Sequence, residues 1–343
     1  MKVVFNARQM SLGGTEIAIY DYARANQEIL GNESLVLYNA TSPANIPEVI
    51  EKFRGLCEVL PYDNVRAVDQ IIRRRGGDVF HALKSGFPDG GIAFDVPTAV
   101  HAVFPTDPSD AHGTRFAYVS EWLSQECSGG TIPFVPHIVD LPQPTGSLRP
   151  ALGIPADALV IGLYGSRTSF DVPDAADGLL AALERRPDLW VLNLALARAP
   201  AHPRVLTLKG SADLGFKANF IETCDALLHA RSLGESFGLA CGEFSLRNRP
   251  VLTWGGSPHR CHLQILGDRA LVWNDAAGLT RLLLGLDRRE IAAGDWDCYS
   301  RAFSPQAVME TFRRVFLDDV TRDFVRPALT ERLRARYRAW RDR

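Results

Sequence analysis

Short apolar runs alternate with amphipathic stretches along nearly all of this sequence. In the first half, apolar runs at Lys2–Phe5 and Ser34–Tyr38 flank the helical pattern of Thr15–Leu30. In the second half, the run Leu159–Tyr164 precedes the helical pattern of Asp174–Arg185. Parallel strands need a crossover between them, and a helix usually supplies it. The alternation therefore predicts an α/β fold built from doubly wound, Rossmann-like sheets.

The same reasoning places the remaining elements. We expect further strands at Asp78–His81, Pro97–Ala102, Phe116–Val119, Trp190–Ala195, Arg204–Leu208, Ala226–Ala230, Pro250–Thr253 and Ala270–Trp273. We expect further helices at Asn64–Arg75, from Ser120 onward, at Phe216–Cys224 and at Phe237–Leu246. Ligands of doubly wound sheets bind at the carboxyl ends of strands, where helix N-termini point. Functional residues are therefore expected in the loops that follow strands.

The chain is long enough for two domains, since it has 343 residues and domains average ~150. A stretch rich in Pro and Gly, Val139–Pro150, interrupts the periodicity and has the composition of a linker. We expect one Rossmann-like domain over residues 1–146 and a second over 147–317, facing each other across a cleft. Residues 318–343 are expected to form an Arg-rich C-terminal crossover helix that packs back on the first domain.

Charge and cysteine usage restrict the class of protein. The 38 basic and 40 acidic residues nearly balance, which disfavours a nucleic-acid partner. Six scattered cysteines with no C-x-x-C pair indicate a reducing compartment rather than a disulfide scaffold. The apolar run at the N-terminus is too short for a signal peptide, and no window of 18 apolar residues occurs. We therefore expect a cytoplasmic protein.

The C-terminal end carries eight arginines between Thr321 and Arg343, interleaved with apolar side chains such as Leu333 and Trp340. A basic amphipathic helix of this kind can contact an anionic membrane surface, which would place the protein at the inner face of the membrane. The alternative is a helix that packs across the domain junction with its arginines solvated or paired.

Two glutamates, Glu235 and Glu243, lie eight residues apart after the expected strand Ala226–Ala230. On one continuous helix they would share a side and be about 12 Å apart in rise, which suits two ends of an extended ligand better than an acid/base dyad. The expected helix begins at Ser236–Gly238, so the free amides of Ser236, Phe237 and Gly238 would form an anion site for a diphosphate.

The stretch from Ser232 to Glu243, followed by Arg249–Val251, resembles the E-x7-E motif of retaining GT-B glycosyltransferases of the family 4 type. The resemblance implies a nucleoside-diphosphate sugar donor bound by the second domain and an acceptor bound by the first. It also implies that Glu235 contacts the donor sugar and Glu243 the ribose hydroxyls. The alternative is an acidic residue at a helix start with an exposed one two turns later.

Other motifs of the same family are only partly matched in this sequence. Gly13-Gly14, after the first strand, looks like the family's N-terminal glycine loop, although it is equally an ordinary turn before a helix. The family's phosphate-binding Arg corresponds to Arg167, but no Lys follows it here. We assign the second phosphate cation to Lys217, with Lys209 as the fallback. Arg231 replaces the family's Pro before the motif serine and can add a further cation.

Histidines of the first half lie near the expected strand ends. His101 corresponds to a histidine that family members often present to the cleft beside the reacting sugar, so we expect it to be catalytic. Simple burial at a strand end is the competing explanation. His81, Lys84 and His112 are weaker candidates for the same region.

Possible metal sites are not convincing in this sequence. Asp295-Trp296-Asp297 spells the D-x-D of metal-dependent transferases, but no expected strand leads into it. His259 and Cys261-His262 lack a second ligand pair at zinc-finger spacing. We therefore expect no metal and no cofactor; the diphosphate charge would be met by cations and helix amides.

The leading hypothesis is a retaining, metal-independent glycosyltransferase that moves a sugar from a nucleoside diphosphate to a saccharide or other hydroxyl acceptor, as in polysaccharide biosynthesis. One alternative is an inverting enzyme of the same fold with His101 as base. Another is a catalytically silent nucleotide-sugar-binding scaffold. A dinucleotide-dependent oxidoreductase is disfavoured, because no G-x-G-x-x-G follows the first strands.

Overall fold

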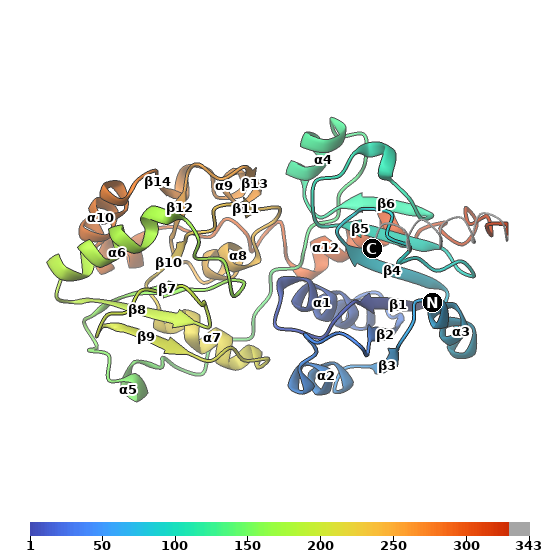
Figure 1. Cartoon of the computed structure of the whole chain (residues 1–343), viewed down its shortest axis with the longest axis horizontal. Coiled ribbons are helices and arrows are strands. Elements are labelled where there is room, and N and C mark those ends of the chain that lie inside the picture. The colour runs from blue at the N-terminus through green and yellow to red at the C-terminus, as the bar shows by residue number, and fades with distance from the viewer. Residues whose placement is uncertain (329–343) are drawn as a thin grey trace. The chain divides into compact units, whose positions relative to one another are not determined.

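The structure is a computed structural model that describes residues 1–328 of the chain. It divides into two compact units (Figure 1). Unit 1 comprises Met1–Ile138 together with the segment from Pro305, and unit 2 comprises Val139–Ser304. The chain therefore leaves unit 1 at the start of the expected linker rather than at 146. It returns at Pro305, earlier than the expected boundary at 317, because the segment after Pro305 packs into unit 1.

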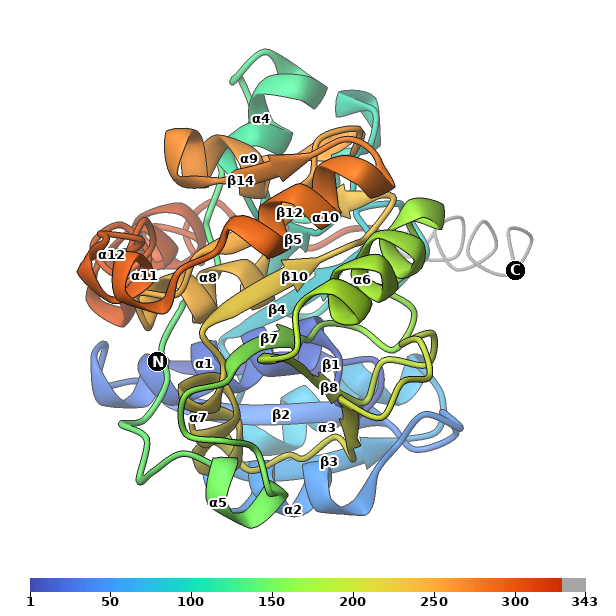
Figure 2. The same ribbon diagram turned by 90° about the vertical axis from the view of Figure 1, so that its left-hand side faces the viewer.

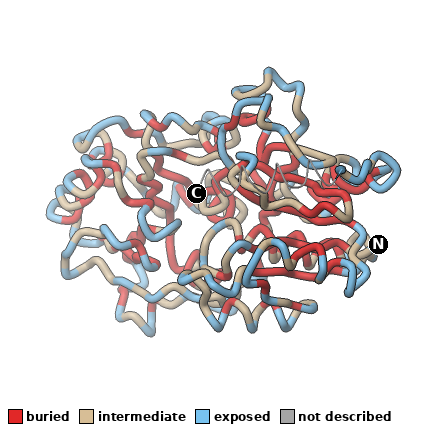
Figure 3. Tube along the Cα trace, turned by 45° about the vertical axis from the view of Figure 1, so that its right-hand side comes forward, coloured by how far each residue is buried: buried red, intermediate tan, exposed pale blue. Residues whose placement is uncertain are grey.

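Unit 1 is built on a six-stranded parallel sheet with the order β3-β2-β1-β4-β5-β6. Its strands are β1 (Lys2–Ala7), β2 (Glu33–Asn39), β3 (Glu58–Tyr62), β4 (Val79–Lys84), β5 (Thr98–Ala102) and β6 (Arg115–Tyr118). The order reverses between β1 and β4, as it does in dinucleotide-binding folds. Residues of β4 and β5 are buried throughout, as strands covered on both faces require (Figure 3).

Helices cover both faces of this sheet. They are α1 (Gly14–Glu28), α2 (Pro47–Arg54), α3 (Arg66–Arg75), α4 (Glu121–Ser128) and α12 (Pro305–Phe312), the last followed by a π-helical turn, η3 (Arg313–Leu317). Phe312 stacks on Phe5 of β1, with ring centroids 6.4 Å apart, and Phe316 contacts His101 of β5 at 5.1 Å. The segment from Pro305 therefore completes the core of unit 1.

The segment 318–328 that follows η3 is not helical. Ion pairs attach it to unit 1: Arg115 contacts Asp323, and Arg326 contacts Asp95. The rest of the expected Arg-rich helix lies outside the described residues. Its expected contact with a membrane surface therefore stays a prediction. Among residues 1–328, no helix is long and apolar enough to cross a membrane.

Unit 2 repeats the architecture with a second six-stranded parallel sheet, ordered β14-β12-β10-β7-β8-β9. Its strands are β7 (Leu159–Leu163), β8 (Leu189–Leu194), β9 (Val205–Leu208), β10 (Ala226–His229), β12 (Val251–Trp254) and β14 (Leu271–Trp273). Numbered within the unit, this is again the order 3-2-1-4-5-6, read from the other edge. The reversal falls between β7 and β10.

Helices flank this sheet as well. They are α5 (Arg149–Leu152), α6 (Pro173–Arg185), α7 (Leu214–Thr223), α8 (Leu239–Leu246), α9 (Cys261–Leu266), α10 (Ala276–Gly285) and α11 (Arg288–Ala293). Figures 1 and 2 show α6 and α10 on one face of the sheet and α7 and α8 on the other. Leu179 of α6 and Leu279 of α10 are fully buried in the core over β7 and β8. On the other face, Gly162 of β7 leaves room for Phe244 of α8, which an added Cβ would approach to 2.7 Å.

The doubly wound prediction is confirmed in both halves of the chain. The sequence patterns missed the strand β3 and the helices α2, α5, α10 and α11. They also missed a small parallel pair formed by β11 (Gly234–Glu235) and β13 (His259–Arg260). The helix expected at Phe237 begins at Leu239 instead.

Candidate functional site

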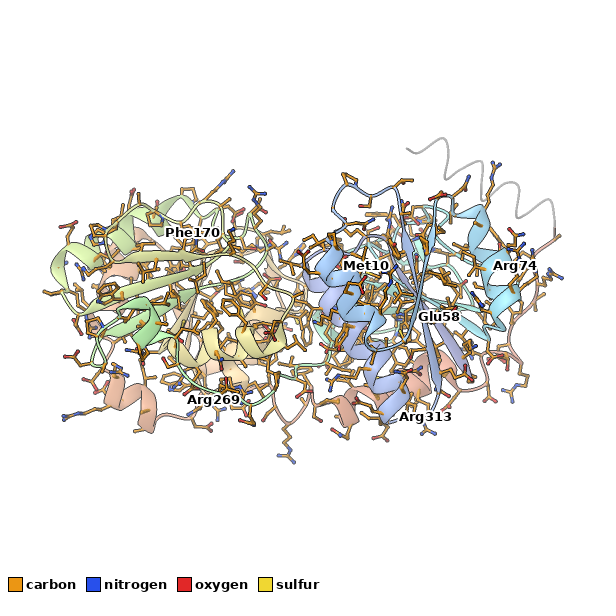
Figure 4. All side chains as sticks on the ribbon, turned by 90° about the horizontal axis from the view of Figure 1, so that it is seen from below. Met10, Glu58, Arg74, Phe170, Arg269 and Arg313 are labelled. Carbon is orange, nitrogen blue, oxygen red and sulfur yellow. The ribbon has the colours of Figure 1, made fainter. Side chains whose placement is uncertain are left out.

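Two loops of unit 2 meet where its strand order reverses. The loop after β7 and the loop after β10 are joined by a bridge between Phe170 and Ala230, and Asp171 N donates to Ala230 O at 3.0 Å. The side chain of Asp171 accepts from Ser232 N at 2.7 Å and from Ser232 Oγ at 2.8 Å. Phe170, labelled in Figure 4, is buried beside them. Of the residues predicted for the second half, Arg167, Arg231 and Glu235 follow these two strands, and Lys217 and Glu243 lie on α7 and α8.

Glu235 is fixed by a tight local backbone. It lies in β11, which pairs with β13, and the preceding Gly234 has φ of +73°. A Cβ added to Gly234 would lie 2.1 Å from His259 O, so only glycine fits there. The spacing suggested that Glu235 and Glu243 share one helix. In the structure they do not, because Glu235 is in a strand and Glu243 is in α8.

The Glu235 carboxylate is held by two basic side chains. Its Oε1 lies 3.1 Å from His229 Nε2, and its Oε2 accepts from Arg231 Nη1 at 2.8 Å. Burial acts to raise the pKa of Glu235, but the hydrogen bond from His229 and the charges of His229 and Arg231 outweigh it and lower the pKa to about 2. Glu235 is therefore an ionised, acceptor-only group at neutral pH.

A buried chain of hydrogen bonds continues behind Glu235. His229 Nδ1 lies 3.0 Å from Thr253 Oγ1, which in turn lies 3.0 Å from His262 Nε2. Since the carboxylate can only accept, His229 Nε2 must donate to it. Burial, then the charge of His229, lowers the pKa of His262 to about 3, so His262 is neutral.

Sequence reasoning missed His229 and Thr253 and considered His262 only as a metal ligand. The available signal was positional: His229 ends β10, Thr253 lies near the end of β12, and the two strands are expected neighbours. The register confirms this, because His229 pairs with Thr253 across the sheet. Polar residues at the same end of adjacent parallel strands are worth combining when a site is sought.

Glu243 is buried in α8 beside Lys217 of α7. Lys217 Nζ lies 2.6 Å from Glu243 Oε1, and the two side chains are 7% and 4% exposed. Glu243 Oε2 is buried without a hydrogen-bond partner among the described residues. Tyr164, at the end of β7, lies against the pair: burial, then the charge of Glu243, raises the pKa of its hydroxyl. Lys217, expected to face a diphosphate, is thus brought together with the expected ribose ligand.

The remaining expected phosphate ligands lie near these loops. Arg167, in the loop after β7, is exposed, and its side chain has no recorded hydrogen bond or ion pair within residues 1–328. Ser236 and Phe237 precede α8, and Gly238 caps it with φ of +97°. The unpaired amides of the first helical turn are therefore those of Leu239–Cys241 rather than of 236–238. Lys209 is exposed after the edge strand β9.

In unit 1, the expected glycine loop forms the N-terminus of α1. Gly13 is the N-cap and Gly14 the first helical residue. Glu16 is buried in the first turn, and its Oε2 accepts from Ser11 Oγ at 2.9 Å. Burial raises the pKa of Glu16 despite this bond, in contrast to Glu235. A Cβ at Gly13 would lie 2.7 Å from Glu16 Oε2, so a larger residue there would have to displace the Glu16 side chain.

His101 lies in the packed core of unit 1. It is 0% exposed, its Nε2 lies 2.7 Å from Val135 O, and its Nδ1 lies 3.3 Å from His81 Nε2. Phe316 contacts the ring edge-on, and burial lowers the pKa of His101 to about 3. With both nitrogens engaged and no exposed surface, this geometry disfavours the expected catalytic role and favours packing.

The aspartates of the D-x-D sequence have local structural partners. Asp295 Oδ2 accepts from Arg269 Nη2 at 2.6 Å, and Asp297 Oδ1 accepts from the amides of Tyr299 and Ser300 (Arg269 is labelled in Figure 4). Within residues 1–328, no group of three His, Cys, Asp or Glu side chains has the geometry to hold a metal ion.

Comparisons with known proteins give a match at the level of structure only. No family model and no curated protein matches the sequence. Among solved structures, HepE from Anabaena in complex with UDP and glucose aligns with a TM-score of 0.69 and 16% identity, over 92% of this chain and 98% of that one. A glycosyltransferase from Rickettsia africae aligns with a TM-score of 0.65 and 11% identity, over 92% and 99%.

A third solved structure belongs to another enzyme class. A putative UDP-N-acetylglucosamine 2-epimerase from Listeria monocytogenes aligns with a TM-score of 0.60 and 12% identity, over 95% of this chain and 98% of that one. These identities support a shared fold and not a shared activity. Two parallel sheets of the same strand order, aligned over nearly the full length with glycosyltransferase structures, show that this chain has the two-domain, Rossmann-like GT-B fold.

Proposed function

We propose that this protein is a glycosyltransferase that moves a sugar from a nucleoside-diphosphate donor to a saccharide or other hydroxyl acceptor, with the nucleotide bound by unit 2. Its fold, and the UDP-glucose bound in the solved structure of HepE, support this assignment. The single observation that carries it is the Glu243 carboxylate: one oxygen is paired with Lys217, and the other is buried without a partner among the described residues.

An unpaired buried carboxylate oxygen is costly. A buried acceptor that lacks a partner costs ~1–3 kcal/mol, and more when it is charged. The two hydroxyls of a ribose can donate to such a carboxylate, and charge-assisted bonds of this kind are strong. Lys217 then has a defined role: its ammonium, 2.6 Å from Oε1, holds the orientation of the Glu243 carboxylate. We therefore move Lys217 from the phosphate site to the ribose site.

Glu235 suits the donor sugar. Its carboxylate is ionised and rigidly held by His229 and Arg231, so it can accept hydrogen bonds from sugar hydroxyls without reorganising. The diphosphate would be met by Arg167 and by the N-terminal amides of α8, whose dipole favours negative charge. These groups would stabilise the charge that develops on the leaving diphosphate.

We further propose that transfer is metal-independent and retains configuration. Support comes from the E-x7-E resemblance and from the cationic and amide groups just described, which can take over the charge neutralisation that a metal supplies elsewhere. Exhaustive EDTA treatment should leave activity intact. Activity that is abolished by EDTA and restored by Mn²⁺ or Mg²⁺ would contradict this, and Asp295 and Asp297 would then need study as ligands.

The first experiment is a thermal-shift screen with UDP, GDP, ADP, TDP and CMP on the wild-type protein and on Glu243→Ala. Binding at a hundredfold excess over Kd stabilises the native state by ~2.7 kcal/mol. We expect one nucleotide to raise the Tm of the wild type, and that shift to shrink in Glu243→Ala. Asn274→Asp, an exposed site in the same unit, is the control. No shift with any nucleotide would refute the proposal.

An epimerase is the second candidate, because the Listeria structure shares the fold. Product analysis separates the candidates. A transferase releases free nucleoside diphosphate and, without acceptor, slowly releases sugar to water. An epimerase returns an isomeric nucleotide sugar or sugar, and a silent scaffold binds the donor unchanged. Nuclear magnetic resonance of the donor after incubation distinguishes all three.

A further inference from the structure

Unit 1 has a polar pocket of about 220 Å³ at the carboxyl edge of its sheet. Four adjacent strands contribute a residue at or next to their last position: Asn6 of β1, Asn39 of β2, Tyr62 of β3 and Lys84 of β4. Polar residues of the adjoining loops complete the lining: Arg8, Thr41, Asp63, Asn64 and Asp89. The edge beside the reversal between β1 and β4 is where doubly wound sheets bind ligands.

Hydrogen-bonding groups on the pocket lining are arranged in advance. Tyr62 Oη donates to Asn6 Oδ1 at 3.0 Å, which fixes the amide. Asn6 is 6% exposed, and its amide N–H bonds have no partner among the described residues. Neither group belongs to the machinery assigned to unit 2. An oriented amide next to a phenol can recognise a hydroxyl that both donates and accepts.

The charges of the pocket are balanced. Asp89 lies between two cations: it contacts the buried Lys84, and its Oδ2 accepts from Arg8 Nη1 at 2.7 Å. Lys84 also lies 3.2 Å from His112 Nε2. Asp63 is a second carboxylate, so the pocket lining holds two carboxylates and two cations. An anionic ligand would have to displace Asp89 from its partners, whereas a neutral hydroxyl can use lone pairs and N–H bonds that the ion pairs leave available.

We propose that this pocket binds one residue of a neutral saccharide. Its volume is below the ~300–1,000 Å³ of sites for drug-sized ligands, which suits a single sugar ring. The balanced charges and the mixture of amide, phenol and carboxylate match a polyol and not a phosphate or a uronate. If the protein is a glycosyltransferase, as proposed above, the pocket identifies the acceptor class as a neutral glycan, and this extension rests on that function.

The test is binding of the full chain to a printed array that carries neutral oligosaccharides and, separately, glycans with uronate, sialate or phosphate groups. We expect retention on neutral glycans. Asn6→Asp keeps the acceptor for Tyr62 but removes both N–H donors, and should weaken retention at least tenfold. Thr41→Trp, at the exposed rim, narrows the pocket without burying a charge and should weaken it as well. Asn274→Asp makes the same Asn-to-Asp change at an exposed position of unit 2 and should leave glycan retention unchanged.

Retention of acidic glycans alone, no retention at all, or retention that both pocket variants leave unchanged would overturn the proposal. A thermal shift with the nucleotide that binds unit 2 shows that each variant is folded. It also separates the two proposals: neutral glycan binding without any nucleotide shift would refute the transferase and leave the pocket standing. A nucleotide shift without glycan binding would do the reverse.

Discussion

Removing one partner of the buried Lys217–Glu243 pair should destabilise the protein more than removing both. Each side chain is less than a tenth exposed and the charged atoms are 2.6 Å apart, so a lone survivor would be a buried, uncompensated charge. Breaking such a pair costs ~3–5 kcal/mol, whereas replacing both members with apolar groups is often neutral or stabilising. The variants are Lys217→Met, Glu243→Leu and the double variant.

Thermal unfolding gives the magnitude. For a unit of the size of Val139–Ser304, 1 kcal/mol corresponds to ~2–4 °C in Tm, so each single variant should lose ~6–20 °C. The double variant should unfold within a few degrees of the wild type. Glu51 and Arg54 form an exposed pair on α2, and removing either should change stability by less than ~1 kcal/mol.

Nucleotide binding then separates stability from function in the same proteins. The double variant should be stable but should lose the nucleotide-induced shift, because a charge-assisted hydrogen bond is worth ~1.5–3 kcal/mol, or roughly 10- to 150-fold in affinity. A double variant as unstable as the single ones would show that the pair is not coupled. A double variant that binds nucleotide normally would refute the ribose role of Glu243.

Three further predictions concern other groups. Glu235→Gln should spare nucleoside-diphosphate affinity while lowering turnover, and equal loss of diphosphate affinity in Glu235→Gln and Glu243→Ala would contradict the assignment. His229→Phe should move the acid limb of the pH profile of turnover to higher pH, because the Glu235 carboxylate loses the hydrogen bond that does most to lower its pKa. Arg167→Ala should lower turnover with any neutral acceptor, and Arg167→Lys should restore part of it if the contact is a point charge; unchanged turnover in Arg167→Ala excludes a phosphate contact. Burial holds the pKa of His81 well below its ordinary value, so the neutral His81 side chain stabilises the fold fully above about pH 6.5, and this stabilisation is lost as pH falls. His81→Phe should therefore reduce the slope of the free energy of unfolding against pH by up to ~1.4 kcal/mol per pH unit. An unchanged slope would show that His81 does not titrate on unfolding.

Local pattern predicted most strands because burial on both faces leaves a continuous apolar run. Leu159–Leu163 and Thr98–Ala102 are buried at every position, and both were located within a residue or two. The pattern failed at Glu58–Tyr62, an edge strand that contains a proline and whose burial does not alternate. Boundaries of the units depended on packing between distant segments: Phe312 and Phe316 fill a core formed by the first 138 residues, and no local signal shows this.

The candidate site also contains residues that local sequence predicts and residues that only the fold brings together. Spacing drew attention to Glu235 and Glu243, and Lys217 was proposed as the second phosphate cation because no Lys follows Arg167. Their partners were missed, because His229 and Thr253 are 24 residues apart in sequence and come together through the β10–β12 register. The signal that could have found them was their position at the same end of neighbouring strands. For His101 the sequence and the structure point in different directions: a histidine at a strand end matched a family position, whereas the structure places it in the core of unit 1.

The shared strand order cannot decide which unit binds the nucleotide, so the decision rests on charge. Each unit buries a glutamate after a glycine turn at the carboxyl edge of its sheet. In unit 1, the Oε2 of Glu16 is bonded to Ser11, and burial raises the pKa of the carboxyl toward the neutral form. In unit 2, Glu243 is paired with a buried ammonium and keeps one oxygen for a ligand. A diol needs an acceptor oxygen without a partner, and the buried Oε2 of Glu243 is such an atom. These arrangements favour unit 2 as the site of the proposed nucleotide, and we expect a Glu16→Gln variant, as the corresponding control, to retain full nucleotide affinity.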